Sequence, residues 1–559
     1  MQGNDKSTLF KTSLGLSLLA GLFFLPFLGG VHLFDWDEIN FAEISREMLI
    51  SKNYLRPLIN YLPFWEKPPL FIWMQALAMQ VFGVGEYAAR FPNAICGILT
   101  LVVIYRIGAK LHHHRMGLLW ALSYFGSVLP FLYFKSGIID PWFNLFIFLG
   151  LYNLILFYWK KEQQKIELPK NRWTYLIIGG LLLGMAILTK GPAAYLITGL
   201  TLGVYWVYKR FRFYINVPQF VLFTIAAFLI TGLWFGIETI KNGPWFITEF
   251  TRYQYRLFST PDAGHGGFPG YHFVVLLVGC FPASIFAIRA FFKLPEAERE
   301  VQVDFRRWMK FLFWVVLILF TIVKSKIVHY SSLAYFPLTY LAALSVENII
   351  AGKIPFNRGL KIGLWSIAGL YILIIVALPW LGQRPELLQT FMDKDPFAYA
   401  NMEAQVRWTG WEFWPGLFLL LALIAFFVLL RRKGAQVAFP TLFLCTGCFV
   451  FFTLITFIKR VEGYSQRAAI EFYESKIGED CYVWTYGYKS YAHLFYTRKQ
   501  PVQNPKSYEQ DWLLQGEVDK TTYIVCKINK VAELQALGTL KEVGRKNGFV
   551  FFERTPLTQ

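Results

Sequence analysis

The chain has 559 residues, of which 55% are hydrophobic, 19% are aromatic and only 16% are charged. Soluble domains carry about 25% charged residues, so this composition excludes an ordinary soluble protein and favours one with many membrane spans of about 20 apolar residues each. The formal net charge of +19 suggests a nucleic-acid partner, but the placement of the basic residues, described below, argues against one.

Thirteen apolar runs predict membrane-spanning helices along the chain. The first run follows Lys6 and Lys11 and continues into DWDE without a small-residue cleavage site, so we expect a retained signal anchor. A further apolar stretch over 69–83 is short and begins at a pair of prolines, which favours an interfacial or re-entrant helix. The thirteen runs lie at about 12–33, 87–107, 117–134, 142–159, 173–188, 192–208, 218–236, 271–289, 311–323, 332–350, 362–380, 414–430 and 437–458.

The loops between these runs differ in charge. With the N-terminus inside, the inner loops hold 24 Lys and Arg against 7 Asp and Glu, whereas the outer loops hold 14 of each. This asymmetry follows the positive-inside rule and accounts for much of the basic surplus without a nucleic-acid partner. We therefore expect a cytoplasmic N-terminus, a membrane domain over 1–458, and a region over 459–559 outside the cytoplasm.

The region 459–559 combines an amphipathic, helix-like stretch (VEGYSQRAAIEFYESKI) with strand-like runs (CYVWTYG, TTYIVCKI and FVFFER). This mixture predicts a small α/β domain on the outer face of the membrane. Cys481 and Cys526 can form a disulfide if this domain is extracytoplasmic. Cys445 and Cys448 form a CxxC inside an apolar run without a partner pair, so we expect them to pack between helices.

The outer segment after the first span, 34–86, concentrates charged residues at the membrane edge. Asp37 and Glu38 directly follow the apolar run, where acidic groups cost free energy unless they are used. Glu66 and Lys67 lie between Trp65 and two prolines, which restrict their conformation. A solvated, salt-bridged loop is the ordinary interpretation of such a segment, but these two details favour a functional one.

Three other outer segments are expected at the active site: 135–141, 237–270 and 324–330. Asp140 starts a helix just before Pro141, so an N-cap is its simplest interpretation. Lys190 lies in a tight turn between two spans, where a lysine beside Gly-Pro is ordinary. The remaining polar residues of interest are Arg252, Arg256, Asp262, His265, Lys324, Lys326, His329 and Tyr330.

Together these segments bring carboxylates, cations and a histidine to one face of the membrane. A carboxylate can remove the proton from an acceptor hydroxyl. Cations can take up the charge that appears on a phosphate leaving group as its bond breaks. The pattern therefore predicts group transfer from a phosphate-linked donor.

The sequence DEINFAEISREML resembles the signature that follows the first span in the bacterial lipid A aminoarabinose transferases, which are related to the protein O-mannosyltransferases. The resemblance continues through WEKPP, IIDPW, LTKGP, the loop from Arg256 to His265 and KSKIVHY, over about residues 10–340. It implies a GT-C fold, an undecaprenyl-phosphate sugar donor, an inverting transfer and a periplasmic active site at a bacterial inner membrane.

The resemblance also implies roles for individual residues. Asp37 corresponds to the catalytic carboxylate, and the other candidate catalytic acids are Glu38 and Asp140. The candidate contacts of the donor phosphate are Lys67, Arg256 and Tyr330, with Lys326 as a weaker match. A divalent metal is implied at Glu66 and His265, although one Glu and one His are too few ligands for a closed zinc site. No other cofactor is expected.

Two departures leave the donor sugar open, aminoarabinose in particular. Ile39-Asn40-Phe41 stands where the family has Thr-Arg-Tyr, and Gly266 stands where an arginine commonly follows the loop histidine. We expect an inverting glycosyltransferase that moves a sugar from a polyprenyl phosphate to a lipid, such as a lipid A-like molecule, or to another acceptor. The alternative is a protein O-mannosyltransferase-like enzyme with a peptide acceptor. A membrane transporter is less expected, because its ionisable residues would lie near mid-span.

Overall fold

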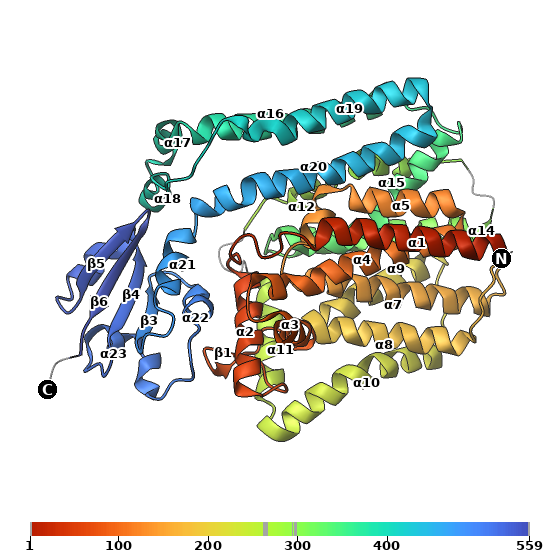
Figure 1. Cartoon of the computed structure of the whole chain (residues 1–559). Helices are drawn as coiled ribbons and strands as arrows, with labels where there is room; N and C mark the ends of the chain where they lie inside the picture. Colours follow the sequence, from red (N-terminus) through yellow and green to blue (C-terminus); the bar gives the residue numbers. More distant parts are fainter. Residues whose placement is uncertain (1–2, 261–265, 293, 296–298, 557–559) are drawn as a thin grey trace.

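The computed structural model of the chain describes residues 3–260, 266–292, 294–295 and 299–556. Long helices run side by side in a bundle, and a small domain that contains a β-sheet lies at one end of it (Figure 1). Helix α1 begins at the opposite end of the bundle (Figure 1). The N-terminal end of α1 and the sheet domain therefore lie at opposite ends of the bundle.

Nine helices in the described part of the chain are long and apolar enough to cross a membrane. A tenth span is formed if the pair α12 (Tyr271–Gly279) and α13 (Ala283–Phe291), bent by 120°, is counted as one. The expected class, a polytopic helical membrane protein, is confirmed. The nine are built on α1 (Gly3–Phe24), α4 (Glu86–Leu111), α7 (Asp140–Lys161), α8 (Arg172–Lys190), α10 (Val217–Asn242), α15 (Tyr335–Ile350), α16 (Arg358–Gly382), α19 (Trp414–Arg432) and α20 (Ala435–Gly463).

The expected number of spans, thirteen, is larger than this because three apolar runs form shorter or more charged helices. The run at 117–134 is divided at Gly126, which packs against the backbone of Phe443 where no side chain fits. The run at 192–208 forms a helix of only 16 residues, and the run at 311–323 is the end of a helix whose first half is charged. These helices are α5 (His114–Phe125), α6 (Val128–Tyr133), α9 (Ala193–Tyr208) and α14 (Glu300–Ile322).

Short elements lie across the end of the bundle that faces the sheet domain. Helices α2 and α11 run across the bundle axis there, and α3 lies beside α2 (Figure 1). The stretch 69–83 forms α3, an apolar helix of 13 residues, which is too short to span a membrane. The elements of this layer are α2 (Asp37–Ser51), β1 (Leu58–Ile59), β2 (Leu62–Pro63), α3 (Leu70–Phe82), α11 (Trp245–Ser259), α17 (Pro385–Met392) and α18 (Pro396–Asn401).

The C-terminal domain contains a four-stranded sheet in the order β3-β4-β6-β5, in which only β3 and β4 are parallel. One face of the sheet buries Val525 and Phe551 together with Ile470 and Phe495 of the adjoining helices, and this core continues to Ile39 of α2. The domain therefore packs directly on α2. Its elements are α21 (Arg467–Glu474), β3 (Tyr482–Tyr486), α22 (Ala492–Tyr496), α23 (Gln510–Gln515), β4 (Thr522–Lys527), α24 (Val531–Gln535), β5 (Lys541–Lys546) and β6 (Phe549–Arg554).

The cysteines form no disulfide within the described residues. Cys481 and Cys526 are both free thiols, and Cys526 is buried in the sheet. The disulfide considered for this pair is therefore not formed. Cys445 and Cys448 are free and partly buried on α20, in agreement with a packing role.

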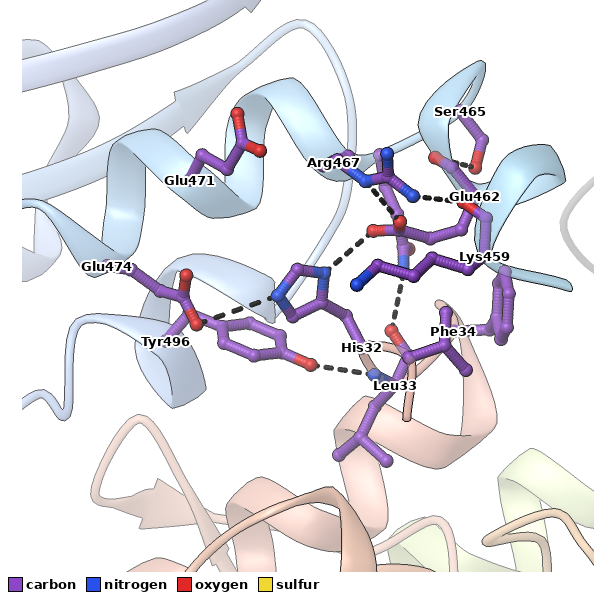
Figure 2. Close-up of polar contacts among 12 residues, drawn as sticks. His32, Leu33, Phe34, Lys459, Glu462, Ser465, Arg467, Glu471, Glu474 and Tyr496 are labelled. Carbon is purple, nitrogen blue, oxygen red and sulfur yellow. Dashed lines mark hydrogen bonds and ion pairs between the residues drawn. The ribbon is translucent and has the colours of Figure 1, made fainter. Parts of the chain in front are cut away.

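The loop between α1 and α2 attaches the C-terminal domain to the bundle (Figure 2). His32 Nδ1 lies 2.7 Å from Glu462 Oε1, and His32 Nε2 lies 3.6 Å from Glu474 Oε1. The backbone N–H of Leu33 donates to the Tyr496 hydroxyl at 2.7 Å. Burial lowers the pKa of His32, but the two glutamates outweigh burial, so the pKa is raised above its ordinary value.

Candidate active site

Glu38, the second residue of α2, is buried and fully paired. Its Oε2 lies 2.7 Å from Nη2 of Arg90 in α4, and its carboxylate accepts the backbone N–H groups of Phe34 (2.9 Å) and Gly137 (2.5 Å). Burial alone raises the pKa of this carboxyl, but Arg90 and the two N–H groups outweigh burial and hold the pKa below its usual range. Glu38 therefore ties α2 to the bundle, and its oxygens are occupied.

The EISRE segment of α2 is buried as well. Glu43 and Arg46 form two hydrogen bonds of 2.7 Å, and Arg46 also donates to the carbonyl of Lys499 in the C-terminal domain at 2.8 Å. Glu47 accepts the backbone N–H of Tyr61 at 2.7 Å. Burial, with the neighbouring Glu43 charge, raises the pKa of Glu47 above its ordinary value. These residues attach α2 to the β1–β2 hairpin and to the C-terminal domain.

The three residues at which α2 departs from the family signature are buried too. Ile39 is in the core shared with the C-terminal domain, and Phe41 packs against Phe71 and Ile139. Asn40 is 3% exposed. The departures therefore alter how α2 packs against its neighbours.

Asp37, the first residue of α2, lies in a different environment. Its side chain is 30% exposed, and its Oδ2 lies 3.6 Å from His329 Nε2 in the 3-10 helix η2 (Val328–Ala334). The same nitrogen lies 3.9 Å from Asp140 Oδ2 at the start of α7. Both separations are longer than a hydrogen bond. Nε2 of His329 is therefore the common neighbour of the two carboxylates.

Asp140 is buried and held by one cation. Its Oδ1 accepts a hydrogen bond of 2.6 Å from Lys190 Nζ at the end of α8. Its Oδ2 is buried and has no hydrogen-bond partner among the described residues. The N-cap interpretation of Asp140 is wrong, because Ile139 takes the N-cap position and no side-chain cap bond forms. A buried oxygen without a partner costs free energy, and His329 Nε2 is its neighbour at 3.9 Å.

Three cations surround two tyrosine rings beside these carboxylates. Lys67 Nζ donates to the Tyr253 hydroxyl at 3.2 Å and lies 4.7 Å from the centre of its ring. Arg256, on the same helix α11, lies 5.2 Å from this ring, and Lys190 lies 5.3 Å from the ring of Tyr330. The charges of both aspartates and of Lys67 act on Tyr330. The carboxylates and the cations therefore form one cluster.

Lys326 does not join this cluster. Its ammonium donates to the carbonyls of Phe320, Thr321 and Val323 at 2.9, 2.6 and 2.5 Å. It therefore neutralises the carbonyl end of α14, where a cation is favourable. Its assignment to the donor phosphate stays a prediction that this placement does not favour.

The expected metal site is only partly visible. Glu66 is half-buried in the loop before α3, and His265 lies outside the described residues. Within the described part of the chain, no group of three or more His, Cys, Asp and Glu side chains is arranged to hold an ion. A closed metal site needs about four ligands, and of the two predicted ligands only Glu66 lies in the described part of the chain, so metal binding stays a prediction.

The sequence assigned no role to three residues of the cluster. His329 and Lys190 were visible only as ionisable residues at the membrane edge, and Tyr253 gave no signal. Their partners lie on other helices, so no local spacing could reveal them. Of the predicted residues, the structure brings Asp37, Asp140, Lys67, Arg256 and Tyr330 together, and it places Glu38 and Lys326 in structural contacts.

This geometry supports transfer chemistry. A half-exposed carboxylate beside a histidine can accept a proton from a hydroxyl. The ammonium of Lys67 and the guanidinium of Arg256 can bind a phosphate through charge-assisted hydrogen bonds. The carboxylate and the two cations lie at the end of the bundle that faces the C-terminal domain.

Known proteins match both the sequence and the fold. The model of the dolichyl-phosphate-mannose-protein mannosyltransferase family matches residues 66–235. The undecaprenyl phosphate-alpha-4-amino-4-deoxy-L-arabinose arabinosyl transferase of Photorhabdus laumondii is 24% identical over 389 residues, 67% of this chain and 68% of that protein. The enzyme of the same name from Pseudomonas aeruginosa is 28% identical over 400 residues, 69% and 68% of the two chains.

The similarity of the fold covers almost the whole chain. The crystal structure of ArnT from Cupriavidus metallidurans bound to undecaprenyl phosphate superposes with a TM-score of 0.74 at 17% identity, over 99% of this chain and 98% of that one. The bundle with its C-terminal sheet domain therefore has the GT-C membrane fold. In sequence and in fold, the chain is similar to the ArnT-like glycosyltransferases.

Proposed function

We propose that the chain transfers a sugar from a polyprenyl phosphate to a lipid acceptor, such as a lipid A-like molecule, with inversion at the anomeric carbon. The observation that carries this proposal is that Asp37 and Asp140 both lie near Nε2 of His329, next to Lys67 and Arg256. The names of the relatives support a donor built on undecaprenyl phosphate.

In the proposed reaction Asp37 is the general base. It accepts the proton of the acceptor hydroxyl while the acceptor oxygen forms a bond to the anomeric carbon of the sugar. The bond from this carbon to the phosphate oxygen breaks on the opposite face of the ring, and its electron pair leaves with the phosphate. Lys67 and Arg256 stabilise the phosphate charge that results.

His329 and Asp140 position the base. The 3.6 Å contact from His329 to Asp37 lets the imidazole orient the carboxylate and take up its proton after transfer. Asp140 is fixed by Lys190, and its Oδ2 lies on the His329 side. The two carboxylates therefore act on the same nitrogen of one imidazole, Nε2 of His329.

We also propose that the reaction takes place on the periplasmic face of the bacterial inner membrane. The excess of Lys and Arg in the loops on the N-terminal side supports a cytoplasmic N-terminus. The sheet domain, at the other end of the bundle (Figure 1), is then periplasmic. A periplasm-only reporter fused after residue 559 should be active, and activity of a cytoplasm-only reporter there would contradict this orientation.

The test is a transfer assay with the purified chain in liposomes. Labelled sugars on undecaprenyl phosphate are offered with lipid A or with a Ser/Thr-rich peptide, and the products are identified by mass spectrometry. The proposal expects a sugar of inverted anomeric configuration on lipid A. Transfer to the peptide alone would favour the protein mannosyltransferase reading, for which the family match over 66–235 is the supporting observation. Transfer to neither acceptor from any such donor would refute the proposed function.

A further inference from the structure

A cavity lies between the C-terminal domain and the β1–β2 hairpin, outside the Asp37 cluster. Its volume is about 260 Å³, which is below the roughly 300–1,000 Å³ typical of drug-sized ligands and suits a single small ring. Polar and aromatic side chains share its wall. They include Asn60 of the hairpin turn and Trp484, Lys489, Tyr491, His493 and Gln510 of the C-terminal domain.

This cavity is joined to the loop that carries the proposed base. The Ser490 hydroxyl, which lines the cavity, donates a short hydrogen bond to Asp35 Oδ2. The ring of Tyr491 packs 5.4 Å from the ring of Trp36. Asp35 and Trp36 directly precede Asp37, so one wall of the cavity continues into the active-site segment.

The cavity also contains buried polar groups without a partner. Trp484 Nε1 is buried and makes no hydrogen bond to any described residue, and the same is true of His493 Nδ1. His493 is 6% exposed, and burial lowers its pKa to about 3, so the ring is neutral. Leaving such groups unpaired costs free energy.

The combination of groups identifies the class of ligand. A pyranose presents C–H groups on its faces, which pack on aromatic rings, and hydroxyls around its edge. Here Trp484 and Tyr491 supply rings, and Asn60, His493 and Gln510 supply neutral hydrogen-bonding groups. We propose that this cavity binds a saccharide unit of the acceptor and so positions the acceptor beside Asp37. This inference rests on the proposed glycosyltransferase function.

The test uses a substitution that fills the cavity from its solvent side. Gln510 is exposed at the start of α23, so Gln510→Trp should enter the cavity without disturbing a core. Gln515→Trp is the matched control, because Gln515 is exposed on the same helix but does not line the cavity. Binding of N-acetylglucosamine to the full chain in detergent is measured by saturation-transfer NMR, which needs no turnover.

We expect saturation of the sugar ring protons with the wild-type chain, with Gln515→Trp and with Asp37→Asn, and its loss with Gln510→Trp. In the transfer assay, Gln510→Trp should raise the KM for the acceptor about tenfold, which corresponds to one lost contact group, and leave the KM for the donor unchanged. Normal sugar binding and a normal acceptor KM in Gln510→Trp would overturn the inference and leave the proposed function intact. If the wild-type chain binds the sugar but transfers nothing, the proposed function is overturned, whereas the sugar-binding site is supported.

Discussion

Helix α2 carries acidic residues in two different environments, one buried and hydrogen-bonded and the other partly exposed. Glu38 and Glu43 are buried and hydrogen-bonded to arginines, whereas Asp37 is partly exposed and, among the described residues, has the longer 3.6 Å contact to His329. A carboxylate with a complete set of donors is stabilised as an anion and is a poor base. A carboxylate with few donors keeps lone pairs open to a substrate hydroxyl. In adjacent residues, the number of donors therefore separates a structural acid from a reactive one.

The largest effect is expected on the buried side. Glu38→Ala leaves Arg90 without its partner inside the protein, which costs about 3–5 kcal/mol. The measurement is thermal unfolding in detergent. The control is Asp480→Ala. Asp480 pairs with Lys520, but its side chain is 80% exposed, so its removal should change the free energy of unfolding by less than about 1 kcal/mol. Equal losses in the two variants would mean that burial of the pair contributes nothing.

On the reactive side, Asp37→Asn should keep the fold and the binding of the donor but lower turnover at least about 10²-fold. This loss corresponds to about 2.7 kcal/mol in the barrier. Transfer of labelled sugar and donor binding are measured in parallel, with Asp480→Asn as the control. Near-normal turnover of Asp37→Asn would move the assignment of the base to Asp140.

Two lysines test the cation cluster. Lys67→Met removes a charge-assisted contact of roughly 1.5–3 kcal/mol, so the kcat/KM for the donor should fall at least about tenfold. Lys326→Met should act mainly on thermal stability, because its ammonium is committed to three carbonyls of α14. A larger loss of donor use in Lys326→Met than in Lys67→Met would reverse these two assignments.

His329 should have a smaller effect. His329→Gln keeps a nitrogen donor near both aspartates but cannot take up a proton, so kcat should fall by up to about tenfold while the KM for the donor stays constant. The pH dependence of kcat should also change, because the titrating group is gone. An unaltered pH profile with unaltered kcat would limit His329 to packing.

The smallest effect concerns His32 in the attachment of the C-terminal domain. Its pKa is raised in the folded protein, so protonation contributes stability that is complete below the ordinary value of 6.5 and is lost as the pH rises through the raised pKa. The free energy of unfolding of the wild type, measured by thermal unfolding, should therefore fall by about 1 kcal/mol or less as the pH rises over this range. His32→Gln should remove this dependence of stability on pH. If the dependence persists in the variant, it belongs to another titrating group.

The sequence predicted the helical membrane bundle, the C-terminal α/β domain and the side of the bundle that carries the charges, because these depend on local composition. Adjacent residues with the same charge could not be told apart in this way. Glu38 was a catalytic candidate beside Asp37, and only its contact with Arg90, fifty-two residues further on, places it in a structural pair. Likewise, the local sequence predicted an N-cap at Asp140. The contact of Asp140 with Lys190 could not be predicted, because Lys190 lies fifty residues away in sequence.

The firm attachment of α2 bears on how enzymes of this kind can diverge. Its buried side is fastened to α4, to the β1–β2 hairpin and to the C-terminal domain by hydrogen bonds that do not involve Asp37. Natural selection can then exchange residues in the surrounding loops, such as Gly266, and keep the reacting carboxylate at a constant position. A lineage can in this way adopt a new sugar without inventing a new reaction.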